Sequence, residues 1–375
     1  MSVWMHVHMG ISVCFHKERE GFETMKKGKM FAILMILAML TTLIAGCGGS
    51  DKKPAEKPAA PAKPAGPSGK LMIYTSMFPD IIEAVKPELK KAFPNLDVQW
   101  FQAGSEQVMT KLAGEIEAKK VQADVLMVSD PGYYITLKEK NLLLKFDAPN
   151  RQFVDAKYKD NEGYWTGVRL SYMLMAYNTT KVKPEEAPKS FKDLLDPKWN
   201  NKLAMANPLL SGSILTVTAD LSQRYGWDYF KALKANGMKI EGGNTAVQNK
   251  LVTGEYFVGI IGEENILKVS AKGEPLKVAY PTDGAVILPS PIAIFASSQN
   301  PEAAKAVTDW WLSKEGQQAI VTKGWMHSVR NDVPPPKGAP DKAVITKNSP
   351  MLDWGKFAKE AEIVKETFRK TMLEK

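Results

Sequence analysis

Short apolar segments alternate with amphipathic segments along the chain, and no other feature constrains the fold as strongly. In chain order, the first expected elements are a strand at 71–74, a helix at 79–93, a strand at 96–101, a helix at 105–120, a strand at 125–128 and a helix at 132–140. Pro79 suits a first helical turn, whereas Pro87 is expected to kink or restart the same helix. Strands separated by helices in this way predict a parallel α/β sheet with right-handed crossovers.

A second unit of the same kind begins near residue 177. Its expected elements are strands at 202–206, 256–261 and 276–280 and helices at 212–225, 245–253 and 263–272. Two longer stretches, 167–178 and 286–296, could each pass between the units, and two such crossings make a hinge. The predicted fold class is therefore α/β with two lobes, parallel-rich sheets, flanking helices and a ligand cleft at the hinge. We expect lobe 1 at 70–168 and 287–333, lobe 2 at 169–286 and a C-terminal helical segment at 334–375.

The segment before the lobes has the composition of a targeting signal. Residues 25–29 are basic, 30–44 are almost entirely apolar, and small residues lead to Cys47. A basic region followed by roughly 15 apolar residues is typical of a secretory signal, because a membrane span needs ~20. The ending Leu-Ile-Ala-Gly-Cys resembles the bacterial lipobox, which implies a lipoprotein signal peptide at 25–46 and lipidation of Cys47. A plain signal peptide or a single membrane anchor is the alternative.

The regions on either side of this signal also carry predictions. Translation is expected to start at Met25, which would make residues 1–24 an upstream artefact of gene calling. Residues 47–69 are rich in proline, alanine and lysine and cannot bury a core, so they should form an extended tether. We therefore expect the folded body to lie outside the cytoplasm, held at a membrane by its lipid anchor.

Several common kinds of site are missing from the expected mature chain. Processing at Cys47 would remove Cys14 and leave His327 as the only histidine, so no disulfide, zinc-thiolate site or Cys/His nucleophile pair is expected. No P-loop or Gly-x-Ser-x-Gly elbow is present. The net charge of +9 is scattered rather than gathered into a nucleic-acid-binding stripe. We expect no cofactor, no metal site, no nucleic acid partner and no catalytic residues, in a protein that is a monomer.

Several segments together resemble the ferric-iron-binding-like family of bacterial solute-binding proteins. They are Tyr74-Thr75-Ser76, Ala123-Asp124-Val125, Leu194 to Trp199, Ala206-Asn207-Pro208, Ser211-Gly212-Ser213, Tyr280 to Gly284 and 297–317. The resemblance covers nearly all of residues 70–333. It implies the type 2 periplasmic-binding-protein fold, with a cleft between two lobes, and delivery of a small ligand to the permease of an ABC importer.

Candidate binding residues follow from a rule about open α/β sheets, which bind ligands beyond the carboxyl ends of their strands. Ser211-Gly212-Ser213 is the most informative segment, because glycine permits a close approach and free amides with hydroxyls favour an oxyanion. Ordinary helix capping is the alternative for this segment, and turn or first-turn roles are the alternative for the candidate carboxylates. The full candidate set is Thr75, Ser76, Ser129, Asp130, Asn207, Ser211, Gly212, Ser213, Glu263, Glu264 and Asp283.

The resemblance also bears on the ligand. Ferric-binding members of the family use an adjacent tyrosine pair, a histidine and a carboxylate. Here the segment matching the pair reads Gly-Glu-Glu-Asn at 262–265, Phe78 stands in place of the histidine, and Asp130 lies near the carboxylate position. Other branches carry phosphorylated or phosphonate-like organic anions, which suit hydroxyl-rich helix starts better. We expect such an anion, with ferric iron or an iron complex as the alternative.

Two other classes of protein stay open at this point. A hydrolase could use Asp130 with Glu263 or Glu264 as a carboxylate pair. A structural or adhesive surface lipoprotein would need no ligand at all.

Overall fold

The computed structural model describes residues 66–374. The expected upstream artefact, the signal peptide, Cys47 and most of the tether lie outside the described residues. Within the described range, no helix combines the length and the apolar character that a membrane crossing requires.

The first lobe is built on three parallel strands, as the sequence predicts. The strands are β1 (Gly69–Thr75), β2 (Leu96–Gln102) and β3 (Val125–Met127), and they lie in the order β2-β1-β3. The helices that follow them are α1 (Pro79–Ala92), α2 (Ser105–Glu117) and α3 (Pro131–Glu139). Helix α1 continues through Pro87, so the expected restart is wrong. Pro87 is exposed and the helix packs through a buried stripe at Ile81, Val85 and Leu89, so the lost hydrogen bond leaves a carbonyl near water.

The second lobe repeats the arrangement with additional elements. Strand β5 (Leu203–Ala206) pairs in parallel with β6 (Lys239–Glu241) and β7 (Val258–Gly262). Its helices are α4 (Gly212–Tyr225), α5 (Trp227–Ala235), α6 (Asn244–Thr253) and α7 (Glu263–Ser270). Helix α5 and strand β6 were not predicted. Five short 3-10 turns lie in connections: η1 (Pro149–Phe153), η2 (Ala156–Tyr158), η3 (Pro184–Glu186), η4 (Phe191–Leu195) and η5 (Pro197–Trp199).

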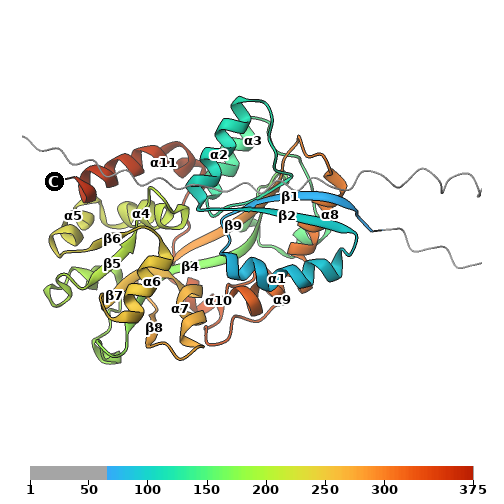
Figure 1. Ribbon diagram of the computed structural model, residues 1–375. Coiled ribbons are helices and arrows are strands. Elements are labelled where there is room, and N and C mark those ends of the chain that lie inside the picture. The colour runs from blue at the N-terminus through green and yellow to red at the C-terminus, as the bar shows by residue number, and fades with distance from the viewer. Residues whose placement is uncertain (1–65, 375) are drawn as a thin grey trace, which may run out of the picture. The chain divides into compact units, whose positions relative to one another are not determined.

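Two long strands pass through both lobes (Figure 1). Strands β4 (Thr166–Asn178) and β9 (Val286–Ile294) pair antiparallel with each other. On one side β9 pairs with β3, and on the other β4 pairs with β7 and with β8 (Leu276–Ala279). The strand order β2-β1-β3-β9-β4-β7-β5-β6 therefore makes one continuous sheet. The expected lobe boundaries at 168/169 and 286/287 fall inside these strands and stay predictions.

Alternate side chains of β4 belong to different hydrophobic cores. Leu170 and Tyr172 pack in the core of the first lobe, together with α8 (Pro301–Leu312) and α9 (Lys314–Gly324). Met175 and Tyr177 pack in the core of the second lobe. Because successive residues of a strand point to opposite faces, one strand can contribute to both cores.

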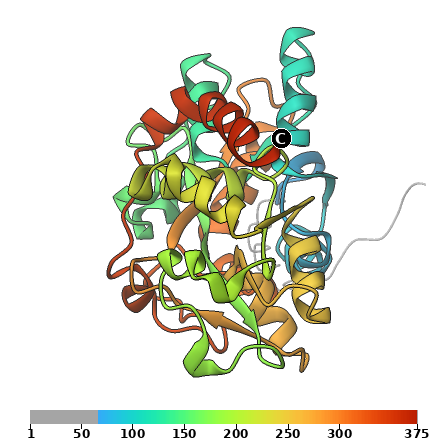
Figure 2. The same cartoon turned by 90° about the vertical axis from the view of Figure 1, so that its left-hand side faces the viewer.

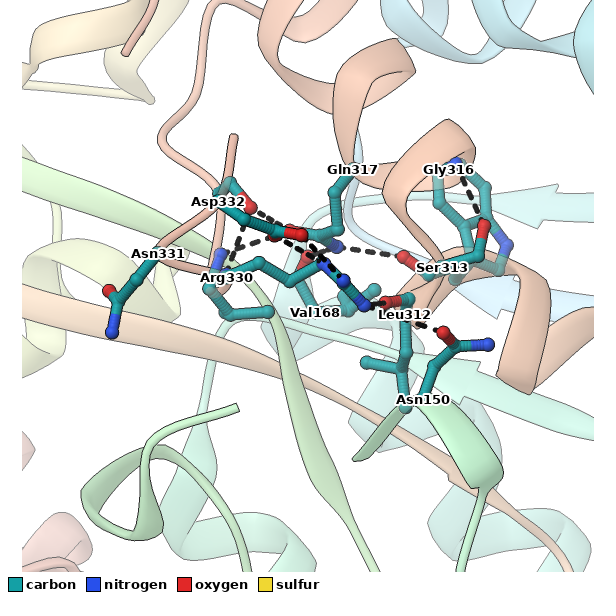
Figure 3. A network of polar contacts seen from close by, with 12 residues as sticks. Asn150, Val168, Leu312, Ser313, Gly316, Gln317, Arg330, Asn331 and Asp332 are labelled. Atoms are coloured by element: carbon teal, nitrogen blue, oxygen red, sulfur yellow. Dashed lines mark hydrogen bonds and ion pairs between the residues drawn. The ribbon is translucent and has the colours of Figure 1, made fainter. Parts of the chain in front are cut away.

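A buried polar network fixes the segment after α9 to the first lobe (Figure 3). The side chain of Gln317 donates to the carbonyl of Val168 at 2.6 Å and accepts from the amide of Val329 at 2.9 Å. Arg330 donates to the carbonyl of Leu312 at 3.2 Å and to both carboxylate oxygens of Asp332 at 2.8 and 2.9 Å. The network satisfies polar groups that would otherwise be costly to bury, and it ties this segment to the start of β4.

The C-terminal segment contains α10 (Lys342–Thr346), α11 (Trp354–Phe368) and a final π-helical turn, η6 (Arg369–Leu373). Figures 1 and 2 show α11 beside α4, and it contacts both α3 and α4. Gly132 in α3 allows this approach, because a Cβ atom there would lie 2.9 Å from Phe357. At its other end the Phe368 ring meets the Phe230 ring of α5 edge-on, at 6.0 Å between centroids. Helix α11 therefore connects the two lobes outside the sheet.

Candidate functional site

A cavity of about 460 Å³ lies between the lobes, beyond the carboxyl ends of the parallel strands. The first turns of α1, α2, α4 and α6, or the residues just before them, form part of its wall. The amides of a first helical turn have no acceptor inside the helix, and the helix dipole favours negative charge there. The backbone alone therefore makes this cavity favourable for an anion.

The lobes touch beside the cavity at Gly212, the first residue of α4. A Cβ atom at this position would lie 2.7 Å from the carbonyl oxygen of Ser129 and 3.2 Å from the Cβ of Ser105. Only glycine lets the start of α4 come this close to the first lobe. The structure therefore has its lobes in contact around the cavity.

Hydroxyl groups are gathered at the same place. The Ser211 and Ser213 hydroxyl oxygens lie 3.0 Å apart, and the amide nitrogen of Asn244 donates to Ser213 at 3.1 Å. In the first lobe, the hydroxyl of Ser129, which lines the cavity, lies 3.1 Å from that of the buried Ser290 of β9. The hydroxyls of Ser129, Ser211 and Ser213 line the cavity, and each could donate to a ligand oxygen by rotating about its Cβ–Oγ bond.

Arg169 contributes the one guanidinium among the residues that line the cavity. It lies on β4, is 3% exposed, and donates from Nη2 to the Ser129 hydroxyl at 3.2 Å. Within the described part of the chain, its buried Nε and Nη1 atoms have no acceptor. Burial lowers the pKa of Arg169, and the nearby Glu264 carboxyl opposes that shift. A buried guanidinium normally has its donors paired, so this one is placed to receive an additional acceptor.

Glu264, in the first turn of α7, is the carboxylate among the cavity-lining residues. It is 9% exposed, and burial raises its pKa to about 7. The charge of Glu263 raises the pKa of Glu264 further. The backbone amide of Glu264, the charge of Arg169 and the Ser171 hydroxyl lower it. The cavity lining therefore contains one guanidinium and one carboxyl group, and the carboxyl group changes its charge near neutral pH.

Sequence reasoning placed five candidate residues at this cavity. Ser76, Ser129, Ser211, Ser213 and Glu264 all line it. Gly212 lies directly behind the wall, at the contact between the lobes. Contact with a ligand stays a prediction for each of them.

Three other candidates have local structural roles instead. Thr75 is fully buried, with its hydroxyl donating to the carbonyl of Met127 and accepting from the amide of Met77, both at 3.0 Å. Asn207 accepts from the amide of Leu209 at 2.9 Å and shapes a turn. Asp130 caps α3, as the alternative interpretation expected.

Asp130 accepts from the amide of Tyr133 at 3.2 Å and opens toward a different cavity, of about 600 Å³ between α2, α3 and α11. Burial raises its pKa to about 6. Asp130 and Glu264 line different cavities and Glu263 lines neither of them, so the structure does not assemble the carboxylate pair that a hydrolase would need.

The remaining candidate carboxylates, Glu263 and Asp283, accept hydrogen bonds from other groups of the protein. Glu263 accepts from the Tyr280 hydroxyl at 2.5 Å and lies 2.9 Å from Nε2 of His327, with only 1% of its surface exposed. Asp283 accepts from the amide of Phe191 at 2.9 Å and from the Tyr225 hydroxyl at 2.7 Å. Neither residue lines the cavity, and the Oδ1 atom of Asp283 is buried without a donor among the described residues.

Several residues of the cavity were missed. Arg169 and Ser171 lie in a strand that the sequence identified only as a crossing between lobes. A charged residue in an otherwise buried stretch was the available signal, because such a charge requires a partner. The Gly242-Gly243 pair before α6 was a second signal, since glycines before a helix allow a ligand to approach its first amides.

The fold and the cavity agree with a known family. A family model described as a bacterial extracellular solute-binding protein matches residues 121–360. The chain belongs to this family. As a solute-binding protein, it has the class of function that its sequence resemblance implied. Among residues 66–374, no three histidine, cysteine or acidic side chains are grouped as a metal site would require.

Individual relatives are similar over most of the folded body. The Fe(3+)-binding periplasmic protein of Serratia marcescens is 25% identical over 216 residues, covering 55% of this chain and 63% of that protein. A putative 2-aminoethylphosphonate-binding periplasmic protein of Salmonella typhimurium is 27% identical over 256 residues, covering 64% and 72%. The periplasmic binding protein AfuA of Actinobacillus pleuropneumoniae, solved with fructose-6-phosphate bound, matches with a TM-score of 0.72 at 24% identity, covering 81% and 98%. The predicted two-lobed fold is thereby confirmed.

Membership of the family also fixes the role of the solute-binding protein in transport. It captures a small ligand outside the cytoplasm and works with the permease of an ABC importer. Proteins of this family act as transport receptors rather than as enzymes. The resemblance stated from the sequence is confirmed at this level.

Proposed function

We propose that this solute-binding protein captures a small phosphorylated or phosphonate-like organic anion in the cavity between its lobes. The observation that carries the proposal is the buried Arg169 guanidinium, with two donors that have no acceptor within residues 66–374. A phosphoryl or phosphonyl group offers three acceptor oxygens and can take a guanidinium in a two-point interaction. The cavity volume of about 460 Å³ lies in the range of small-molecule sites.

The surrounding groups support the same class of ligand. Ser76 from the first lobe and Ser211 and Ser213 from the second line the cavity near helix starts. Hydroxyl and amide donors from both lobes would bind different oxygens of one anion, so the ligand would bridge the lobes. A bound anion would therefore favour the closed arrangement.

Ferric iron fits this cavity less well. Arg169 would place a positive charge next to the metal ion, and Glu264 is the acidic side chain in the lining. The segment that matches the tyrosine pair of the ferric-binding branch reads Gly-Glu-Glu-Asn at 262–265 in this sequence. The names of the relatives include both an Fe(3+)-binding and a phosphonate-binding protein, and Arg169 is our reason for favouring the anion.

The proposal is tested by titration calorimetry of the purified protein with a panel of sugar phosphates and alkylphosphonates, alongside ferric citrate. We expect saturable binding of at least one organophosphorus compound. With ferric citrate we expect no tyrosinate-to-iron absorption band in the visible range. A stable visible band at stoichiometric iron, together with no heat from any organophosphorus compound, would return the protein to the ferric-binding class.

We further propose that the protein is a monomer anchored by a lipid on Cys47, as the lipobox resemblance implies. Replacing Cys47 with serine should prevent lipidation and move the protein from the membrane fraction to the soluble fraction. Cell fractionation followed by detection of the protein measures this. A variant that stays in the membrane fraction would contradict the lipid anchor.

Gly212→Ala should hold the lobes apart, because the new methyl group would lie 2.7 Å from the backbone oxygen of Ser129. We expect ligand affinity to fall about tenfold and the radius of gyration with ligand, measured by X-ray scattering, to rise. Alanine is a better helix former than glycine, so the melting temperature of the ligand-free protein should not fall. Gly114→Ala in α2 is the control, because nothing lies within 4 Å of its new methyl group. Equal affinity in both variants would show that closure does not need this contact.

A further inference from the structure

We propose that the cavity takes up a proton together with its anionic ligand, and that Glu264 is the residue that accepts the proton. The inference rests on the proposed function, since it assumes that a phosphoryl or phosphonyl group occupies the donors of Arg169. Glu264 and Arg169 both line the cavity, from α7 and β4. The ligand would replace Glu264 as the counter-charge of Arg169, and a proton from solvent would neutralise the displaced carboxylate.

Glu264 and Arg169 balance each other without using the donors that a ligand needs. When Glu264 is ionised, its charge opposes the effect of burial on the pKa of Arg169. The Nε and Nη1 atoms of Arg169 nevertheless have no acceptor among residues 66–374. An anion that binds these atoms therefore adds negative charge to a cavity in which the guanidinium already has a counter-charge.

The carboxyl group of Glu264 is folded back against the start of α7. A Cβ atom on Gly262 would lie 2.7 Å from its Oε1 atom and 2.9 Å from its Oε2 atom. The residue is 9% exposed, so water screens its charge poorly. Repulsion between two negative charges is several times stronger in such a place than in bulk water. A bound anion would therefore raise the pKa of Glu264, because a nearby like charge disfavours the ionised form.

The adjacent carboxyl group of Glu263 is a poor alternative site for the proton. The Tyr280 hydroxyl donates to its Oε1 atom at 2.5 Å, and Nε2 of His327 lies 2.9 Å from its Oε2 atom. Both oxygens of Glu263 are thus engaged, and the residue does not line the cavity. Burial has already raised the pKa of Glu264 to about 7. A further rise would change its charge at neutral and mildly alkaline pH.

The charges that act on Glu264 are those of Glu263 and Arg169. Helix α7 packs against β4, β7, β8 and α6, and β7 carries no titratable side chain. The other titratable side chains on α7 and these elements are Lys268, Tyr172, Tyr177, Lys277 and Lys250. Lys268 pairs with Asp80 and Lys250 with Glu241, whereas Lys277 is exposed. The charge of Glu264 should therefore respond chiefly to the bound anion.

The coupling between ligand and proton is reciprocal, so a ligand that raises the proton affinity of Glu264 binds more tightly when Glu264 is protonated. Between pH 6.0 and pH 8.5 the affinity of the wild type should fall about tenfold more than that of Glu264→Gln. The amide of glutamine stays neutral throughout this range. At pH 8.5 the variant should therefore bind more tightly than the wild type, a gain that damage to the site could not produce.

The experiment is titration calorimetry with glucose 6-phosphate, ethylphosphonate and the panel compound that binds the wild type most tightly at pH 6.0. At pH 8.0 each titration is repeated in buffers with different enthalpies of ionisation, which gives the number of protons taken up per ligand. We expect the wild type to take up at least about half a proton more than Glu264→Gln. Ionisation of the ligand itself is the same for both proteins and cancels in this difference. Infrared difference spectra of the wild type should also show a carboxylate band replaced by a protonated-carboxyl band on binding, which does not depend on a variant.

Asp130→Asn is the matched control, because burial raises the pKa of Asp130 to about 6 while this residue lines a different cavity. This variant should take up as many protons as the wild type. Equal proton uptake by the wild type and Glu264→Gln, with parallel pH profiles of affinity, would overturn the inference and leave the proposed function intact. Failure of every compound of the panel to bind the wild type would overturn the proposed function and this inference together.

Discussion

Arg169→Gln is expected to weaken organophosphorus binding by at least about thirtyfold, the largest effect of any single substitution in the cavity. The guanidinium is 3% exposed and has two donors without acceptors in the described part of the chain, so an anion would form buried, charge-assisted hydrogen bonds with it. Removing one partner of such a pair costs about 2–5 kcal/mol. Titration calorimetry with the tightest ligand of the panel measures the change.

The same substitution should affect folding in the opposite direction. Without ligand, Arg169 is a buried charge whose pKa is lowered by burial, so its removal should leave the melting temperature unchanged or raise it. Arg169→Lys should give an intermediate affinity, because lysine keeps the charge and loses the planar fork. Arg369→Gln, in an exposed ion pair, is the control. Wild-type affinity in Arg169→Gln would remove this residue from the site.

Between pH 5 and pH 8 the ligand-free protein should lose folding stability through Glu264, and Glu264→Gln should abolish that part of the loss. Burial raises the pKa of Glu264 to about 7, from an ordinary value near 4.5. The folded protein therefore holds this proton more tightly than the unfolded chain does. The resulting stabilisation is complete below about pH 4.5 and is lost as the pH rises to about 7. A pKa shift of this size corresponds to a loss of about 3 kcal/mol in the free energy of unfolding.

Thermal melts of wild type and variant across this range measure the effect, as the difference between the two pH profiles. The charges that face Glu264 are those of Glu263 and Arg169, and both are retained in the variant. Asp130 and Asp220, whose pKa values are also raised to about 6, lower stability in the same direction in both proteins, so the difference isolates Glu264. The wild type should therefore lose several degrees more than the variant between pH 5 and pH 8. Parallel pH profiles of wild type and variant would show that folding does not raise the pKa of Glu264.

The alternation of strands and helices was predictable because each element has a local signal. Helix α4 was predicted with the same bounds, 212–225, since it has helical periodicity and ends before Gly226. Helix α5 follows Gly226 directly. A single glycine therefore separates the two helices, and the second helix was not predicted. Strand β6 has only three residues, too few for an alternating pattern to be visible.

The site was predictable only in part, because the position of a residue after a strand does not give the direction of its side chain. The rule about strand ends selected loops that line the cavity, among them the one that contains Ser129. The next residue, Asp130, points into a helix cap and another cavity. Arg169 was missed for a different reason. Its proposed role in ligand binding rests on donors that find no acceptor among residues 66–374, and a sequence does not show which contacts are unmade.

Helix α11 places a further condition on how this receptor opens. Two crossing strands alone would allow the lobes to rotate about the sheet. Here a third connection runs outside the sheet, with Phe357 packed against α3 and Phe368 against α5. Lys365 of the same helix pairs with Glu106 of α2 at 2.7 Å. Opening must therefore either carry α11 with one lobe, breaking its apolar contacts with the other, or bend the sheet while both contacts persist. The free energy of the open, ligand-free state therefore depends in part on a helix that lies outside the cavity. Because the ligand must offset the free-energy difference between the open and closed states, the same helix influences the affinity.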